Sequence, residues 1–375
     1  NVCLVRDSAS RDCEELMYTV IDLFAGAGGL SLGFKQTRKY NIVAAFENSR
    51  DANKTYHRNH PNTALFSDVC EADYSALTKE FGGIDIVIGG PPCQGFSNAN
   101  RQKSYVISKN NMLVKQFVRA VIELHPKAFV MENVGMLKSD VHRFFMSSED
   151  ESVVKQYSIP VALMSITLLE QKYLDGYDRT IVEDEKRLRQ CAWNHDDYLL
   201  LNIIYRQRDN KKKRIAALEK YKKKLLNLAD RLSADCDYAK DPFRICITVS
   251  EVLRDYFNGK IDSCIVTEAL ERPIMTLRML AKALEIIDHK IIIDHYSATG
   301  DLLAYARTFA VYDYIVQIAS AEGYVLDSGI MCAADFGVPQ KRMRFVIMGI
   351  QKTIRTKIAL PKGHLDADEY HTVKD

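Results

Sequence analysis

One reactive side chain, the thiol of Cys93, follows an apolar run of the sequence, at a position where a strand would end. Cys93 comes after the apolar run 84–88 (Ile-Asp-Ile-Val-Ile) and the turn 89–92 (Gly-Gly-Pro-Pro). The run is short and β-branched, which predicts a buried strand, and the two prolines leave a thiol few directions in which to point. An isolated cysteine beside a strand is more often a small core residue. Because packing does not explain two glycines and two prolines in succession, we interpret Cys93 as a nucleophile.

An acid and two arginines accompany two further apolar runs. Glu132 lies near the end of 126–134, where an ionised carboxylate costs free energy unless it is paired or lies in a cleft. Arg342 and Arg344 lead into the run 345–350, and their alternate spacing predicts that they share one face of a strand. Two arginines beside a nucleophile suit an anionic or carbonyl-bearing substrate. The alternatives are a surface carboxylate and ordinary surface ion pairs.

A glycine-rich turn and a distant acid predict a nucleoside-binding site. Gly26, Gly28 and Gly29 lie between a predicted strand at 18–24 and a helix that continues to about residue 39. Glu47 ends the next predicted strand, 19 residues after Gly28. Glycines let a ligand approach the backbone, and an acid at this distance accepts the ribose hydroxyls. The turn lacks the final spaced glycine of dinucleotide-binding proteins, which favours a ligand without a pyrophosphate.

A second carboxylate follows a third short run. Asp68 lies in the predicted strand 64–69, near its carboxyl end. A carboxylate here would line the same crevice and could accept a hydrogen bond from an adenine amino group. The local alternative, a helix N-cap or a turn residue, is about equally well supported.

These residues fall on an alternation of strands and helices, which predicts an α/β fold with a parallel sheet. The carboxyl ends of parallel strands meet at one edge, where ligands bind. Helices are expected at 53–59 and 112–124, and the polar loop 98–110 could close as a lid or contact phosphates. The alternation resumes with a helix at 308–319 and a strand at 323–326.

The middle of the chain has a different character. Between about residues 140 and 305 the strand and helix alternation is lost, and the pattern is mostly helical and charged. Residues 206–232 contain eleven Lys or Arg and three acids. Apolar residues recur there every three or four positions, at Leu218, Tyr221, Leu225, Leu228 and Leu232, which predicts a packed helix or helical hairpin. Its lysines could contact phosphates, although a solvated helix face is the more common explanation of such a run.

Composition limits the class of protein. The chain of 375 residues is 47% apolar and 27% charged, which is typical of a soluble globular protein, and its net charge of +2 does not exclude a nucleic-acid partner. The nine cysteines form no C-x-x-C pair, so neither a disulfide framework nor a zinc site is indicated. We therefore expect a reducing, cytoplasmic location, nucleoid-associated if the source is bacterial. No apolar stretch is long enough to cross a membrane, and the first residues show no secretory pattern.

Six motifs, taken in order, resemble those of the cytosine-C5 DNA methyltransferases, especially the enzymes of bacterial restriction-modification systems. They fall within roughly residues 18–137 and 308–350. The motifs are 22–30 (Asp-Leu-Phe-Ala-Gly-Ala-Gly-Gly-Leu), 46–47 (Phe-Glu), 67–69 (Ser-Asp-Val), 90–97 (Gly-Pro-Pro-Cys-Gln-Gly-Phe-Ser), 131–134 (Met-Glu-Asn-Val) and 337–344 (Gly-Val-Pro-Gln-Lys-Arg-Met-Arg). The resemblance implies a Rossmann-like sheet that binds S-adenosylmethionine and releases S-adenosylhomocysteine.

The resemblance also implies roles for single residues in holding this cofactor. Phe24 would stack on the adenine, Glu47 would hold the ribose, and Asp68 would accept the adenine amino group. The glycine turn would hold the methionine part. The cofactor-binding residues would be Phe24, Gly26, Gly28, Gly29, Leu30, Glu47, Asn48, Asp68, Val69 and Pro92.

For the reaction, the resemblance implies that Cys93 attacks C6 of a cytosine flipped out of double-stranded DNA. Glu132 would hydrogen-bond the N3 atom and the exocyclic amine of that base. Arg344, with Arg342 nearby, would stabilise the base oxygen. The resemblance implies no metal ion.

Two departures from the family pattern bear on organisation. We expect 1–140 to hold the cofactor and nucleophile half of the catalytic domain, 141–305 to be a helical insertion of unknown role, and 306–355 to supply the returning strands. Residues 356–375 would lead into a target-recognition region that is not visible in this sequence. A longer chain or a second polypeptide would then supply that region.

Three alternative functions share some of these features. A tRNA cytosine-C5 methyltransferase has the same motifs, although the Pro-Cys-Gln-Gly-Phe-Ser form and the large insertion favour DNA. A nicotinamide-dependent oxidoreductase would use the glycine turn but leaves Cys93, Glu132 and the arginines unexplained. A non-catalytic nucleic-acid-binding regulator could keep the fold, although the intact Cys93 and Glu132 argue against it.

Overall fold

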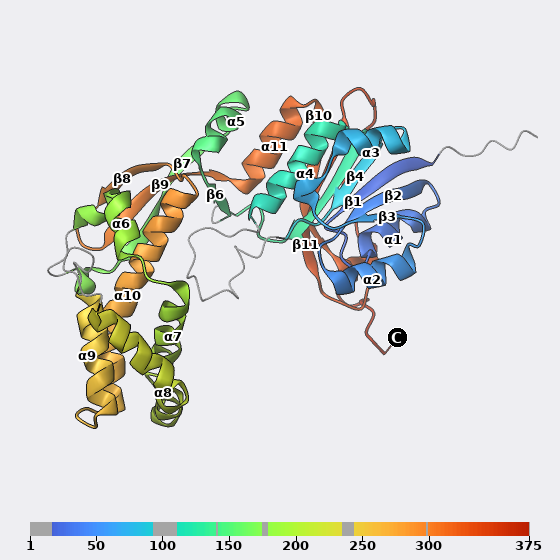
Figure 1. Cartoon of the computed structure of the whole chain (residues 1–375). Coiled ribbons are helices and arrows are strands. Elements are labelled where there is room, and N and C mark those ends of the chain that lie inside the picture. The colour runs from blue at the N-terminus through green and yellow to red at the C-terminus, as the bar shows by residue number, and fades with distance from the viewer. Residues whose placement is uncertain are drawn as a thin grey trace, which may run out of the picture.

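The computed structural model describes residues 17–92, 111–139, 142–174, 179–234, 244–297 and 299–374. Figure 1 shows a sheet covered by helices, from which a second group of helices and strands extends. Cys93 and the expected loop 98–110 lie outside the described residues.

A seven-stranded sheet with the order β10-β11-β5-β4-β1-β2-β3 forms the centre of the larger part. Strands β5, β4, β1, β2 and β3 run parallel, whereas β11 is antiparallel to both β5 and β10. The predicted α/β class is therefore confirmed. The strands are β1 (Tyr18–Leu23), β2 (Tyr40–Phe46), β3 (Ala64–Phe66), β4 (Ile86–Gly89), β5 (Ala128–Val134), β10 (Tyr324–Cys332) and β11 (Met343–Gln351).

Helices cover both faces of this sheet because successive strand residues point to opposite sides. Val20, Ile42 and Ile88 face α1, which contributes Leu30 and Phe34 to this contact. Their neighbours in the strands, such as Ile21 and Val87, belong to a larger core on the other face. The helices that pack on the sheet are α1 (Gly29–Gln36), α3 (Tyr74–Phe81), α4 (Asn111–Leu124) and α11 (Val311–Ala321), and α2 (Arg50–Asn59) connects β2 to β3.

A second, four-stranded sheet and a bundle of helices form the smaller part. In this sheet β9 lies between β6 and β7 and also pairs with β8, all antiparallel. Its strands are β6 (Arg143–Phe145), β7 (Val161–Leu169), β8 (Ile293–Ser297) and β9 (Leu302–Ala310). The helices are α5 (Glu151–Gln156), α6 (Glu185–Cys191), α7 (His195–Tyr205), α8 (Lys211–Ala234), α9 (Ile245–Phe257) and α10 (Ser263–Asp288). Figure 1 shows α7 to α10 on the side away from β1, β2 and β3.

Short 3-10 helices complete the description: η1 (Val69–Glu71), η3 (Ser148–Asp150), η4 (Gln171–Tyr173), η5 (Arg179–Glu183) and η6 (Ala333–Phe336).

Two expectations about individual elements were wrong. The helix predicted at 308–319 begins only at Val311, because Thr308, Phe309 and the residue after them pair with β6 as the end of β9. The strand predicted at 64–69 ends at Phe66, because Asp68 caps η1 instead. The four-stranded sheet was not expected, since β9 pairs with strands more than a hundred residues away in the sequence.

Candidate active site

A cavity of about 370 Å³ opens at the carboxyl edge of the parallel strands. Strands β1, β2, β3 and β4 contribute residues at or just after their carboxyl ends, as expected where parallel strands end together. The lining residues are Phe24 after β1, Phe46, Glu47 and Asn48 at the end of β2, Ser67, Asp68 and Val69 after β3, Gly90 and Pro92 after β4, and Leu113 of α4. Six of the residues predicted to bind a cofactor therefore meet in one cavity: Phe24, Glu47, Asn48, Asp68, Val69 and Pro92.

Glu47 is held in one orientation by the backbone around it. Its Oε2 accepts a hydrogen bond of 2.9 Å from the N–H of Gly26, and its Oε1 accepts one of 2.8 Å from the N–H of Ser49. The backbone of Glu47 itself is tied to β3, because its N–H donates to the carbonyl of Phe66. The glycine turn and the acid predicted to act with it are thus joined directly.

Phe24 lines the cavity from a strained backbone position. Its φ is +60°, in the left-handed region that residues other than glycine rarely adopt. Such strain persists only where the surrounding structure enforces it, and it is commonest at functional sites. Here the N–H of the next residue, Ala25, donates to the carbonyl of Phe46, which fixes the bend between β1 and α1.

Asp68 caps a helix, as one of its two predicted roles requires, and it also lines the cavity. Its Oδ1 caps η1 by accepting a hydrogen bond of 2.8 Å from the N–H of Cys70. The cap fixes the carboxylate at the cavity wall.

Gly28, Gly29 and Leu30 form the start of α1 and are not among the described residues that line the cavity. Gly28 has a φ of +89°, and a Cβ added there would lie 2.6 Å from the ring of His60. The ring Nε2 of His60 is 3.1 Å from the carbonyl oxygen of Gly28. This glycine is therefore required by the close contact between the turn and α2, while Leu30 packs against the sheet.

Glu132 and Arg344 form a second polar centre beside the cavity. Arg344 Nε lies 2.5 Å from Glu132 Oε1, and about a third of each side chain is exposed. The pair is brought together by β5 and β11, in which Arg344 lies opposite Val134. Arg342 precedes β11 and is exposed, and no described contact brings its side chain to Glu132. The predicted pair of arginines is thus divided, and Arg344 alone reaches the acid.

The turn after β4 lies between the cavity and the pair of Glu132 and Arg344. A Cβ added to Gly90 would lie 3.0 Å from Glu132 Oε2. Asn133 Nδ2 donates a hydrogen bond of 3.0 Å to the carbonyl of Pro91, and Pro92 lines the cavity. Cys93 is the next residue in the sequence.

Asp22 was missed by the sequence reasoning. It is 1% exposed, and burial raises its pKa to about 7; hydrogen bonds with Ser31 partly oppose this rise, and the charge of Glu47 adds a smaller one. Ser31 Oγ donates to Asp22 Oδ2 over 2.6 Å and lies 2.8 Å from the hydroxyl of Tyr56. This network ties β1 to α1 and α2 beneath the cavity. The signal was present in the sequence, since Asp22 is an acid within an apolar strand.

In the part of the chain that the structure describes, no helix is long and apolar enough to cross a membrane. The same residues include no group of three or more His, Cys, Asp or Glu side chains that could hold a metal ion.

Comparison with known proteins matches the segments of the chain that contain the cavity residues and the pair of Glu132 and Arg344. A family model described as C-5 cytosine-specific DNA methylase matches residues 18–154 and 303–375, more than half of the chain. Type II methyltransferase M.DdeI of Desulfomicrobium norvegicum is 44% identical over 117 residues, which cover 31% of this chain and 27% of that relative. DNA (cytosine-5-)-methyltransferase M.ApeKI of Aeropyrum pernix is 39% identical over 141 residues, with coverages of 32% and 30%.

A third relative is matched over most of its length. Type II methyltransferase M.HgiGI of Herpetosiphon aurantiacus is 40% identical over 126 residues, which cover 33% of this chain and 96% of that relative. The chain spans less than a third of the length of the other two relatives.

Proposed function

Because the chain belongs to the C-5 cytosine-specific DNA methylase family, we propose that it transfers the methyl group of S-adenosylmethionine to C5 of cytosine in double-stranded DNA. One observation carries the proposal. The cavity lined by Phe24, Glu47 and Asp68 and the pair of Glu132 and Arg344 flank a single turn, and this turn leads directly to Cys93.

The cavity suits S-adenosylmethionine in size and chemistry. Its volume lies within the range of small-molecule sites, roughly 300–1,000 Å³. Phe24 offers an aromatic ring to the adenine, and Asp68 a carboxylate to the adenine amino group. Glu47 already accepts two backbone hydrogen bonds, but a carboxylate has about four acceptor positions, so it can still accept the ribose hydroxyls. When bound, the cofactor supplies an electrophilic methyl group.

Cys93 and Glu132 would activate the base together. The thiolate of Cys93 adds to C6 of cytosine, and the electron pair moves toward C5 while a proton from the Glu132 carboxyl stays at N3. C5 then takes the methyl group. Water takes the C5 proton, the electron pair of that bond expels the Cys93 thiolate, and the proton on N3 returns to the Glu132 carboxylate, which restores the aromatic ring. The target base must first leave the duplex, which costs a few kcal/mol.

Arg344 would orient Glu132 and stabilise the charge that develops on the base. Its contact occupies Glu132 Oε1, so Oε2 lies on the side of the turn that precedes Cys93. A guanidinium that is fixed before the reaction stabilises charge without having to reorganise. We place target recognition in a further segment or a second polypeptide, and the reaction in the cytoplasm.

A trapping assay tests the proposal. The protein is incubated with S-adenosylmethionine and a long duplex DNA in which 5-fluorocytosine replaces cytosine, so that many short recognition sequences are present. Fluorine cannot leave as a proton does, and the enzyme should therefore stay covalently attached. We expect a denaturation-resistant adduct that requires the cofactor.

Matched cysteine variants make the result specific. Cys93→Ala should abolish the adduct, whereas Cys264→Ala, at an exposed cysteine of α10, should leave it unchanged. An adduct on 5-fluorocytosine tRNA but not on DNA would move the activity to RNA. If S-adenosylhomocysteine binds but no adduct forms on either nucleic acid, even when the segment or polypeptide that supplies target recognition is present, the proposed reaction is wrong for this chain.

A further inference from the structure

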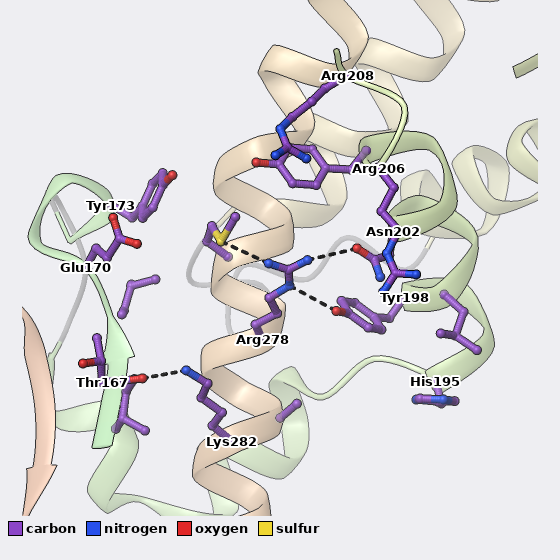
Figure 2. Close-up of a pocket in the computed structure, with 16 residues that line it drawn as sticks. Thr167, Glu170, Tyr173, His195, Tyr198, Asn202, Arg206, Arg208, Arg278 and Lys282 are labelled. Atoms are coloured by element: carbon purple, nitrogen blue, oxygen red, sulfur yellow. Dashed lines mark hydrogen bonds between the residues drawn. The ribbon is translucent and has the colours of Figure 1, made fainter. Parts of the chain in front are cut away.

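A pocket of about 540 Å³ lies between β7, α7 and α10, within the segment that the family model leaves unmatched. Figure 2 shows its side chains converging from these elements and from the loop that carries Glu170 and Tyr173. The pocket belongs to a hydrophobic core separate from that of the seven-stranded sheet. It is therefore distinct from the candidate active site.

Cations outnumber acids among the charged residues that line this pocket. The cations are Arg206, Arg208, Arg278 and Lys282, and among the described lining residues Glu170 is the one acid. Glu170 Oε2 lies 3.1 Å from Nζ of Lys172, and Arg208 Nη2 lies 3.8 Å from Oδ2 of Asp209, but neither Lys172 nor Asp209 lines the pocket. Among the described residues no acid lies within ion-pair distance of Arg278 or Lys282, so these two charges are available to an anion.

Arg278 is fixed at the centre of the pocket by neutral groups. Its Nε donates to the hydroxyl of Tyr198 over 3.2 Å, and its Nη2 donates to Oδ1 of Asn202 over 3.1 Å. Figure 2 shows both bonds reaching from α10 to α7. These acceptors orient the guanidinium without neutralising it, so its charge is preorganised for an anionic ligand.

Lys282 is a second cation held in the same way, one helical turn further along α10. Its Nζ donates to the carbonyl of Thr167 on β7 over 2.6 Å. Burial, and next the charge of Arg278, hold the pKa of Lys282 below its usual value. An anion between the two side chains would relieve this repulsion.

Aromatic rings supply part of the remaining wall, together with aliphatic side chains such as Leu199 and Met275. Tyr173, Tyr198, Tyr205 and His195 line the pocket, and the guanidinium of Arg208 lies 4.9 Å from the ring centroid of Tyr205. Flat aromatic and guanidinium surfaces stack on nucleobases without needing a particular base.

We propose that this pocket binds a nucleoside phosphate, with Arg278 and Lys282 holding the phosphate and the tyrosines and Arg208 holding the base. The ligand could be a free nucleotide or one unit of a nucleic-acid strand. S-adenosylmethionine is excluded by its positive charge. The residues around the pocket favour a nucleic-acid strand as the ligand. Arg206 and Arg208 directly precede α8, whose lysines at 211–213, 220 and 222–224 are all exposed and could contact further phosphates of such a strand.

The test is a calorimetric titration of the whole chain with saturating S-adenosylhomocysteine, which blocks the other cavity. The probes are the four nucleoside monophosphates, the matching nucleosides and a short single-stranded oligonucleotide. We expect a monophosphate or the oligonucleotide to bind, and any matching nucleoside to bind at least tenfold more weakly. Equal affinity for the monophosphate and the oligonucleotide would identify a free nucleotide as the ligand. Tenfold tighter binding of the oligonucleotide would identify a nucleic-acid strand.

Matched variants distinguish binding in the pocket from non-specific electrostatic attraction of nucleotides to the positively charged surface. Arg208→Gln and Lys282→Met should each weaken binding at least fivefold. Arg254→Gln removes the same charge from the surface of α9, where Arg254 pairs with Asp230, and should weaken it less than twofold. The half-exposed Arg208 can be replaced without disturbing the core.

Three results would overturn the proposal: no binding of any nucleotide probe, equal binding of nucleoside and monophosphate, or equal losses for Arg208→Gln and Arg254→Gln. Retained binding of S-adenosylhomocysteine by each variant shows that it is folded. The proposal does not depend on methyl transfer.

Discussion

Glu47 is oriented by the folded chain itself. Both of its oxygens accept backbone N–H groups, from Gly26 and Ser49, so the carboxylate faces the cavity in a fixed position. A glycine turn and a strand end are thereby locked together by one side chain. The spacing of about twenty residues follows from α1 and β2, which lie between the turn and the acid and bring the chain back to the same edge of the sheet.

Replacing Glu47 by glutamine should weaken cofactor binding with little change in fold. The amide nitrogen would face an N–H donor, and hydrogen bonds to charged groups contribute about 1.5–3 kcal/mol. We expect the Kd of S-adenosylhomocysteine to rise about tenfold, measured by calorimetry. Asp51→Asn, at an exposed acid of α2, is the control and should have no effect. Unchanged affinity in Glu47→Gln would remove Glu47 from the binding site.

Asp22 should make stability depend on pH. Its pKa is about 7 in the folded protein and 3.8 in the unfolded chain, so between these values the folded state binds the proton and the unfolded state does not. The free energy of unfolding should therefore fall as pH rises from about 4 to about 7, and then level off.

The variant Asp22→Asn isolates this effect, because its amide oxygen can still accept the hydrogen bond from Ser31. The measurement is urea unfolding of both proteins across this pH range. The difference in unfolding free energy, native minus variant, should be largest near pH 4 and smallest above pH 7. A difference that does not change with pH would show that Asp22 is ionised in the folded state throughout.

At the scale of elements, the turn after β4 couples the cavity to the acid. Gly90 lies against Glu132, Asn133 holds Pro91, and Pro92 lines the cavity. β4 and β5 are adjacent and parallel, so their carboxyl ends place the turn beside Glu132. Movement of this turn would therefore disturb both centres.

Gly90→Ala should reduce methyl transfer more than cofactor binding. The new Cβ would lie 3.0 Å from Glu132 Oε2, so that carboxylate would have to move by a few tenths of an ångström. Since a misplacement of about 1 Å can cost about 100-fold in rate, a smaller one should cost about tenfold. We expect a single-turnover rate about tenfold lower, with the Kd of S-adenosylhomocysteine within twofold of the native value. Gly135→Ala is the matched control, because nothing lies within 4 Å of its added Cβ. Equal rates for the two variants would show that Glu132 has room to move.

At the scale of the molecule, two cores divide the chain. One lies against the seven-stranded sheet, and the other is formed largely by α6 to α10 with β7 and β9. The connection between them is β-structure, since β9 pairs with β6 on one side and with β7 on the other. The family model ends and resumes close to this connection, at residues 154 and 303.

We propose that the second core can be removed without unfolding the first. Met164 lies opposite Ala306 in the β7 and β9 pair, so replacing 165–305 by Asn-Gly would close a two-residue hairpin. The shortened protein should bind S-adenosylhomocysteine within threefold of the native affinity and lose nucleotide binding at the pocket between α7 and α10. Failure to bind S-adenosylhomocysteine would show that the first core requires the second.

The sequence by itself determined the α/β class, the positions of most strands of the large sheet, and the acids and glycines that end or follow them. These are local properties, because a β-branched run followed by glycine and a terminal acid leaves few other structures. The boundary of α11 and the small sheet could not be predicted, because β9 becomes a strand only when β6 and β7 pair with it.

Tertiary structure alone decided which side chains meet. Six of the predicted cofactor residues line one cavity, whereas Leu30 packs against the sheet and Arg344 reaches Glu132 without Arg342. The pocket around Arg278 has no signature in the sequence, since its cations come from the residues that follow α7 and from α10, about 70 residues apart. Spacing along one strand or helix can be read from a sequence, but the contact between two elements depends on how both pack against the rest of the chain.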